Sequence, residues 1–330
     1  MGDRLAAFIT PGKSIDQACA RAKLAEDLGY EAVFATHIAA RDGLMTLAAY
    51  AAATDRIKLG TGVIPAFPRH PVALAYEAAT LDEISGGRLI LGIGMAHGIT
   101  MENWYGHDMS KPLTEFKEYV DVLRSILRTG RVEHAGDYYR SNFAFMNYEP
   151  RPDIPIFTAS LGPNSLRWAG ANSDGIILWS CMPRYIAESV VPLLREGAEE
   201  AGRDPSEIEI VAAVPSAVAH DIAAARDAFR QSFFVYMTLP FYRRVIEGAG
   251  YAENIAVFDA KMAEGDMPGA LAAMSDEMLE HFAGIGTPEA VRAKIAEYRE
   301  AGVTLPAVGL FAVPPDAGGS AEDTLAAAIG

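Results

Sequence analysis

Apolar residues in this chain form short unbroken runs, separated by longer stretches in which they recur at helical spacing. Runs without polar alternation are typical of parallel strands that are covered on both faces. The predicted strands are Leu5–Ile9, Ala32–Ala35, Ile57–Gly60, Leu89–Gly94, Pro155–Ala159, Gly175–Trp179, Ile208–Val214 and Ala307–Phe311. The predicted helices alternate with them at 14–29, 42–53, 74–84, 116–127, 165–171, 185–201 and 287–302. This alternation predicts an α/β fold, a single (β/α)8 TIM barrel.

The residues in excess of a typical barrel lie in two segments. Residues 131–150 show the aromatic alternation of a small hairpin, and residues 220–286 are typical of a helical insertion between the seventh and eighth strands. No linker or low-complexity tract separates a second domain, so we expect one domain over residues 1–330. The tail, residues 315–330, is rich in Gly and Ala, and we expect it to fray.

Composition narrows the class of partner. The 330 residues carry a formal charge of −15 at pH 7, which disfavours nucleic acid and anionic membrane surfaces. The two cysteines, Cys19 and Cys181, give no disulfide framework, and we expect Cys19 to lie in the core. The first residues do not resemble a signal peptide, and no apolar run approaches the ~18 residues of a membrane span. We therefore expect a cytoplasmic enzyme acting on a small molecule.

The loops that follow barrel strands build the active face of such a fold. Here they hold no His-x-His metal motif, no lysine at a strand's carboxyl end and no pair of carboxylates suited to glycoside hydrolysis. We therefore expect no metal site. A face so poor in reactive groups favours a bound cofactor that performs the chemical step. His37 is the one titratable side chain placed directly at a strand end.

The loop after the third strand, Thr61 to His70, is stiff for its length. It contains Gly62 and two prolines, and a third proline opens the following helix. Four short strings lie in order across this region: GTGV, RHP, ATLDEISGGR and LGIG, at residues 60–63, 69–71, 79–88 and 91–94. Together they resemble the bacterial-luciferase-like superfamily of flavin- and deazaflavin-dependent oxidoreductases, and are more similar to its coenzyme F420 branch, which includes the methylenetetrahydromethanopterin reductases.

The resemblance implies hydride transfer between F420 and an organic substrate, with His37 in proton transfer or polarisation near the reactive ring. Relatives often place an acidic residue before this histidine, whereas this chain has Thr36. The resemblance also implies a cis peptide bond between Gly62 and Val63 that backs the ring. The alternatives are a trans loop, in which Gly62 serves only a tight turn, and a His37 that only hydrogen-bonds a neighbouring loop. Further expected cofactor contacts are Thr61, Gly94 and Met95.

A second group of expected cofactor contacts is Gly162, Pro163 and Asn164, between the fifth strand and a helix start. Backbone amides and the helix dipole favour a phosphate at such a position, although Pro163 has no N–H to donate. The continuation LRWAGANSDGIIL resembles the family's phosphate-binding stretch.

The substrate side departs from one branch of the family. Met95 stands where the F420-dependent glucose-6-phosphate dehydrogenases have a glutamate, which disfavours a sugar phosphate. We expect a partly aromatic pocket lined by His97, Trp104, Tyr105 and Trp179. Trp104 and Tyr105 have the alternative role of covering the barrel mouth. We expect His70 to cap a helix. We do not expect Cys181 to act as a nucleophile, because no basic neighbour beyond Arg184 would stabilise its thiolate.

Two other functions stay open at this stage. One is an FMN-dependent monooxygenase that works with a separate flavin reductase, and the other is a barrel that binds flavin or another ligand without catalysis. Relatives commonly form homodimers, and we expect the alanine-rich helices Met45–Ala53 and Leu74–Ile84 to pack against a second copy.

Overall fold

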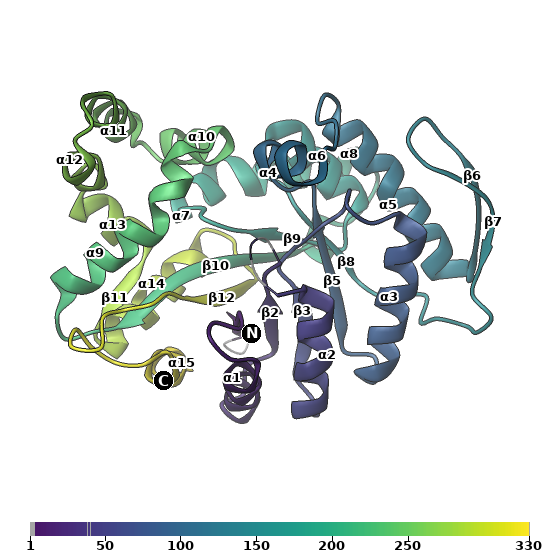
Figure 1. Ribbon diagram of the computed structural model, residues 1–330, viewed down its shortest axis with the longest axis horizontal. Coiled ribbons are helices and arrows are strands. Elements are labelled where there is room, and N and C mark those ends of the chain that lie inside the picture. Colours follow the sequence, from purple (N-terminus) through teal and green to yellow (C-terminus); the bar gives the residue numbers. More distant parts are fainter. Residues whose placement is uncertain (1–3, 38, 40, 330) are drawn as a thin grey trace. The chain divides into compact units, whose positions relative to one another are not determined.

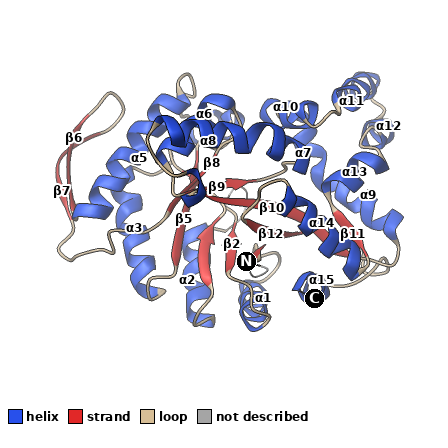
Figure 2. Ribbon diagram, turned by 180° about the vertical axis from the view of Figure 1, so that it is seen from behind, coloured by secondary structure: helices blue, strands red, loops and turns tan. Residues whose placement is uncertain are grey.

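The computed structural model describes residues 4–37, 39 and 41–329. This part of the chain comprises two compact units. One contains residues 4–8, 27–31 and 160–329, and the other contains residues 9–26, 32–37, 39 and 41–159. In each unit the parallel strands lie inside and the helices outside, whereas the strands β6 (Arg131–Ala135) and β7 (Arg140–Phe145) lie at the outer edge (Figure 2).

The unit that holds both termini of the described chain is built on parallel strands. Its strands are β1 (Ala6–Phe8), β9 (Gly175–Leu178), β10 (Glu209–Val218), β11 (Gly284–Gly286) and β12 (Leu305–Leu310). β10 pairs in parallel with β9, β11 and β12, and β12 pairs in parallel with β1.

The helices of this unit include a long series between β10 and β11 (Figure 1). The helices of the whole unit are α6 (Pro163–Asn172), α7 (Pro183–Tyr185), α8 (Val191–Glu200), α9 (Ile222–Phe233), α10 (Pro240–Gly248), α11 (Ala252–Glu264), α12 (Met267–Ala272), α13 (Asp276–Phe282), α14 (Pro288–Glu300) and α15 (Ala321–Ile329). A π-helical turn, Ile186–Val190, joins α7 to α8.

The second unit also contains four successive parallel strands. They are β2 (Ala32–Ala35), β3 (Lys58–Thr61), β5 (Leu89–Gly94) and β8 (Ile156–Ala159), with the short β4 (Ile64–Pro65) paired to β5. Its helices are α1 (Ile15–Asp27, whose last residue belongs to the other unit), α2 (Gly43–Ala53), α3 (Pro71–Ile84), α4 (Gly98–Tyr105) and α5 (Pro112–Thr129). β6 (Arg131–Ala135) and β7 (Arg140–Phe145) form an antiparallel hairpin that stands beside α5 in Figure 1.

The strand order is that of a (β/α)8 TIM barrel, so the expected fold class is confirmed. In chain order, the principal parallel strands are β1, β2, β3, β5, β8, β9, β10 and β12, and helices alternate with them. Every residue of β2, β5 and β9 is buried, as their unbroken apolar runs predict. The ends of the predicted strands agree with the observed ends to within a few residues. Of these strands, β10 extends farthest beyond its predicted end, from Val214 to Val218.

Local sequence explains where several helices begin. The Asp42 carboxylate accepts a hydrogen bond from Met45 N at the start of α2, and the Thr287 hydroxyl accepts one from Ala290 N at the start of α14. The ring of His70 accepts a bond from Val72 N, with Pro71 opening α3. These side chains satisfy amides that the first turn leaves unpaired. The expected capping role of His70 is confirmed.

Two expectations about the chain's packing are wrong. Residues 321–329 form α15 instead of a frayed tail: Leu325 is fully buried, and its carbonyl accepts a 2.8 Å hydrogen bond from the Tyr30 hydroxyl. This tertiary contact holds the alanine-rich helix α15 against the rest of its unit. Cys19 is half-buried rather than in the core. Among the described residues, no helix is both long and apolar enough to cross a membrane.

Candidate active site

His37 lies two residues after β2, and the surrounding backbone determines which of its ring nitrogens carries the proton. Its Nδ1 accepts a 2.8 Å hydrogen bond from the backbone N–H of Gly43, the first residue of α2. A backbone amide can only donate, so the neutral imidazole has its proton on Nε2. Nε2 has no hydrogen-bond partner within the described chain. Among the described residues, His37 is therefore a donor with one uncommitted N–H.

Two charged side chains, Asp42 and Arg69, lie near the Nδ1 side of His37. An Asp42 carboxylate oxygen lies 3.6 Å from Nδ1, and the same carboxylate pairs with the Arg69 guanidinium. Burial lowers the pKa of His37, Asp42 raises it and Arg69 lowers it, with a net shift below the ordinary value. The imidazole is thus held neutral at physiological pH. The carboxylate nearest to this imidazole among those described is thus Asp42, the N-cap residue of α2.

The loop after β3 packs against the same segment as His37. The Gly62–Val63 peptide bond is cis, as the family resemblance implies. Gly62 N donates a 2.8 Å hydrogen bond to the carbonyl of Ala35 at the end of β2. A Cβ on Gly43 would lie 3.2 Å from Ile64 Cγ2 and 3.5 Å from His37 Cβ. The absence of a side chain at Gly43 therefore lets the loop approach the histidine.

The other strand ends of this unit meet the same loop. A Cβ on Gly94 would lie 3.0 Å from Val63 Cγ2 and 3.1 Å from Ala159 Cβ, so only glycine leaves this space open. The Thr61 hydroxyl is fully buried and bonds the Gly92 carbonyl at 2.7 Å. The expected cofactor contacts Thr61, Gly62, Val63 and Gly94 therefore form one cluster.

Thr36 has a polar partner of its own. Its hydroxyl lies 2.8 Å from the hydroxyl of Thr10, two residues after β1. Two hydroxyls in contact share one donor proton, so the other proton remains available for a further acceptor.

The segment after β5 holds Met95 and three of the four predicted substrate residues, His97, Trp104 and Tyr105. Met95 is half-buried, and Ala96 has a left-handed backbone with φ of 60°; a non-glycine residue in this region is strained, and such residues gather at functional sites. His97 precedes α4 and is half-buried, and burial lowers its pKa. Trp104 and Tyr105 end α4 with 58% and 48% of their surface exposed.

The predicted phosphate contacts lie in the first unit, at the start of α6. Gly162 is the N-cap residue, with no side-chain hydrogen bond to cap the helix, and Pro163 and Asn164 are exposed. The Arg244 guanidinium of α10 lies 3.7 Å from where a Cβ on Gly162 would be. Arg244 makes no ion pair within the described residues, so its charge adds to the positive end of the helix.

Trp179 follows β9 in the same unit and lies among aromatic rings. Its ring centroid is 5.2 Å from that of Phe8 and 6.5 Å from that of Tyr236. Ser180 has a left-handed φ of 55°, a second strained backbone position directly after a strand. Cys181 is buried, and burial raises the pKa of its thiol. A neutral thiol is a poor nucleophile, as expected from the absence of a basic neighbour.

Comparison with known proteins decides the family. The sequence profile of the luciferase-like monooxygenases matches residues 3–305. The chain belongs to this family. It is 34% identical to the 5,10-methylenetetrahydromethanopterin reductase of Methanolobus tindarius over 286 residues, or 86% of each chain. It is 30% identical to a provisionally named coenzyme F420-dependent oxidoreductase of Mycobacterium tuberculosis over 306 residues, or 85% of this chain and 87% of the relative.

One solved structure is similar to this chain over nearly its whole length. The structure of the coenzyme F420-dependent tetrahydromethanopterin reductase from Methanopyrus kandleri aligns with a TM-score of 0.83 at 29% identity. The alignment covers 99% of this chain and 96% of that one. The expected membership of the family is confirmed.

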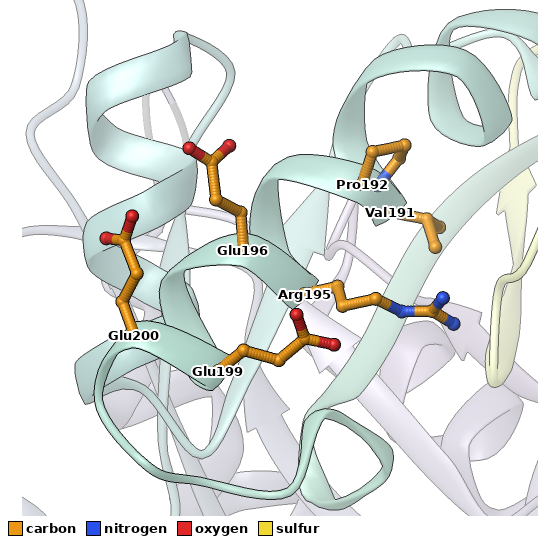
Figure 3. A pocket seen from close by; sticks show the side chains of 6 residues that line it. All are labelled: Val191, Pro192, Arg195, Glu196, Glu199 and Glu200. Carbon is orange, nitrogen blue, oxygen red and sulfur yellow. The ribbon is translucent and has the colours of Figure 1, made fainter.

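A surface pocket of about 350 Å³ lies elsewhere, along α8 (Figure 3). It is lined by Val191, Pro192, Arg195, Glu196, Glu199 and Glu200. Glu196 is paired with Arg167 at 2.8 Å. None of the predicted site residues lines this pocket, and its carboxylates disfavour an anionic cofactor. It does not belong to the candidate active site of this luciferase-like protein.

Sequence reasoning missed three charged residues of the candidate site. Asp42 and Arg69 act on His37, and Arg244 approaches Gly162. Arg69 belongs to the RHP string that identified the family, which is the one signal that could have pointed to it. Asp42 and Arg244 lie at or in helices whose sequence gives no sign of this role.

Proposed function

We propose that this chain is an oxidoreductase that transfers a hydride between coenzyme F420 and a small organic substrate. The observation that carries the proposal is the arrangement at His37. A neutral imidazole, whose Nε2–H has no partner among the described residues, lies near a strand end, beside the loop of Gly62 and Val63. The names of the M. tuberculosis relative and of the M. kandleri structure support F420 as the cofactor.

The residues of the second unit fit the redox-active ring of such a cofactor. When bound, F420 accepts or supplies the hydride. Gly62 and Val63 offer a backbone surface with little side chain, and Gly94 leaves the neighbouring space open. The Thr36 hydroxyl and the half-buried backbone near Met95 provide polar contacts for the ring edge. No acid or thiolate is needed here to perform the redox step.

His37 has a defined role in this proposal. Because Nδ1 is committed to Gly43, the ring donates from Nε2 and holds a hydrogen bond or a proton at a substrate oxygen or nitrogen. Developing negative charge on that atom is stabilised by such a donor. We further propose that His97, Trp104, Tyr105 and Trp179 contact the substrate.

The start of α6 supports a phosphate of the cofactor. Gly162 exposes the helix amides without a competing side-chain cap, and Arg244 adds a cation. The amide of Asn164 is a donor there, whereas Pro163 contributes only its fixed backbone. The same features accept the phosphate of FMN, so they do not by themselves choose between the two cofactors.

A binding titration tests the proposal. The purified chain is titrated with F420 and FMN, each in oxidised and reduced form, and binding is followed by fluorescence and absorbance. We expect F420 to bind at micromolar concentration and FMN about tenfold more weakly or worse, a difference of about 1.4 kcal/mol. Binding of FMN alone would instead support the monooxygenase, and binding without turnover of any substrate would support a non-catalytic barrel.

We also propose a homodimer. Met45 on α2 and Ile84 at the end of α3 expose 73% and 57% of their surface, and both helices carry alanines that permit close packing. Light scattering at micromolar concentration measures the mass, and a monomer would exclude this association.

A further inference from the structure

Arg69 joins two carboxylates in the second unit. Its Nη2 pairs with Asp42 Oδ2, and its Nε lies 3.1 Å from Glu77 Oε2 on α3. The Arg69 side chain is 19% exposed. A guanidinium suits this role because its planar fork can bind two carboxylates at once. Arg69 is therefore held in one position, between the starts of α2 and α3.

Asp42 has three polar groups within reach of its carboxylate. Oδ1 accepts a 3.0 Å hydrogen bond from Met45 N, which caps α2. Oδ2 is bound by Arg69 and lies 3.6 Å from His37 Nδ1, beyond hydrogen-bond distance. The carboxylate thus lies close to the imidazole without accepting a hydrogen bond from it.

The position of Asp42 determines which form of His37 is stable. With Asp42 bound to Arg69, the Gly43 N–H occupies Nδ1 at 2.8 Å and excludes a proton there. A carboxylate free to move toward Nδ1 would instead stabilise a proton on that nitrogen, and with it the imidazolium. Two arrangements therefore compete at this nitrogen, and Arg69 favours the first.

We propose that Arg69 is a positioning residue that holds Asp42 away from His37 and so keeps the imidazole as the tautomer with its proton on Nε2. Its importance for turnover rests on the proposed function, because only there does His37 serve as a hydrogen-bond donor. The tautomer itself is a property of the chain alone.

The charges around His37 support this assignment. Burial lowers the pKa of His37, Asp42 raises it and Arg69 lowers it. Glu77 acts on the same network through Arg69, and Arg41 is directed at the carbonyls of Pro11 and Gly12. Removing Arg69 both ends its repulsion and releases Asp42, so the two effects have the same sign.

Imidazole nitrogen NMR tests the proposal directly. Ring ¹⁵N chemical shifts report which nitrogen is protonated, and a pH titration gives the midpoint for each of the seven histidines. The His37 signal is assigned by its loss in His37→Asn. We compare the unaltered chain with Arg69→Met, Arg69→Lys and Asp42→Asn. Arg151→Met is the control, because Arg151 forms a similar ion pair with Asp82 in the same unit, at 2.8 Å.

The two principal variants have opposite expected results. Arg69→Met raises the proton affinity of His37 about tenfold and allows a proton on Nδ1. Asp42→Asn, which still caps α2, lowers the affinity and leaves the Nε2–H tautomer intact. Arg69→Lys falls between Arg69→Met and the unaltered chain, and Arg151→Met changes neither property.

An unchanged midpoint and ring pattern in Arg69→Met would overturn the proposal. So would a rise in proton affinity in Asp42→Asn, which tests the same contact should Arg69→Met fold poorly. The F420 titration is run on the same samples. Absence of F420 binding in every sample would remove the proposed function, while the NMR result would still decide the role of Arg69.

Discussion

The imidazole Nε2 of His107 lies 3.0 Å from Oε2 of Glu115, whose side chain is only 7% exposed. The other carboxylate oxygen accepts a 2.7 Å hydrogen bond from the Tyr139 hydroxyl. The His107 ring also stacks on Phe67, with centroids 4.7 Å apart. Glu115 therefore joins the segment after α4 to the turn of the hairpin, and His107 connects it to Phe67 in the loop after β3.

We expect Glu115→Ala to lower the free energy of unfolding by about 1–3 kcal/mol, because it leaves His107 and Tyr139 without their acceptor. Urea denaturation measures the change. The control is Glu280→Ala. Glu280 pairs with Arg226 and its side chain is 62% exposed, and an ion pair at the surface contributes about 0–1 kcal/mol to stability. Equal losses in the two variants would show that the Glu115 contacts do not stabilise the fold.

His37→Ala tests the proposed donor. We expect turnover to fall by about 10²–10⁴-fold, the usual contribution of a positioned proton donor. F420 affinity should change little, because the backbone near Gly62 and Gly94 is retained. Steady-state kinetics with a substrate that supports turnover, together with F420 fluorescence, separate the two quantities. Normal turnover would assign His37 a structural role.

Arg244→Gln tests the anion site at α6. We expect F420 affinity to fall about tenfold, since a charge-assisted contact with phosphate is lost, and the salt dependence of binding to weaken with it. Arg243→Gln is the control, because the neighbouring Arg243 is already paired with Asp259. If both variants bind alike, Arg244 does not contact the cofactor.

The lowered pKa of Glu26 leads us to expect that the fold loses stability in acid. Burial raises the pKa of Glu26, but hydrogen bonds from the backbone amides of Arg56, Ile57 and Asp55 outweigh it and hold the pKa at about 2. A carboxyl with a lowered folded pKa stabilises the fold above its unfolded value, near 4.3, and loses this contribution as the pH falls toward 2.

We therefore expect the free energy of unfolding to fall by about 2–3 kcal/mol more in the unaltered chain than in Glu26→Gln between pH 4.5 and 2. Denaturation by urea at several pH values in this range measures the difference. Parallel pH curves for the two proteins would mean that Glu26 does not titrate with the fold.

The contact between α6 and α8 depends on glycine. A Cβ on Gly197 would overlap the Arg167 carbonyl oxygen, and one on Gly170 would overlap the Leu194 carbonyl oxygen. We expect Gly197→Ala to destabilise the fold by about 1–3 kcal/mol, because the helices must separate. Gly12→Ala is the control, since a Cβ there meets nothing within 4 Å. Thermal unfolding measures both.

Much of the fold could be predicted because its signals are local. Unbroken apolar runs mark strands covered on both faces. The caps Asp42 and Thr287, and Pro71 in a first helical turn, mark helix starts. The family strings predicted the cis bond at Gly62–Val63. Helix α4 was missed because its eight residues, Gly98–Tyr105, bury only Met101, so they show no apolar stripe.

By itself, the sequence determined the fold class, the family and the placement of His37 at a strand end, because each depends on neighbours in the chain or on short ordered strings. Only the tertiary structure decided which nitrogen of His37 donates, since that depends on Gly43 N–H, Asp42 and Arg69. The same is true of Arg244, which lies 82 positions from Gly162 in the numbering. Side chains so far apart in the chain are brought together by the packing of helices, and no local pattern records which of them will meet.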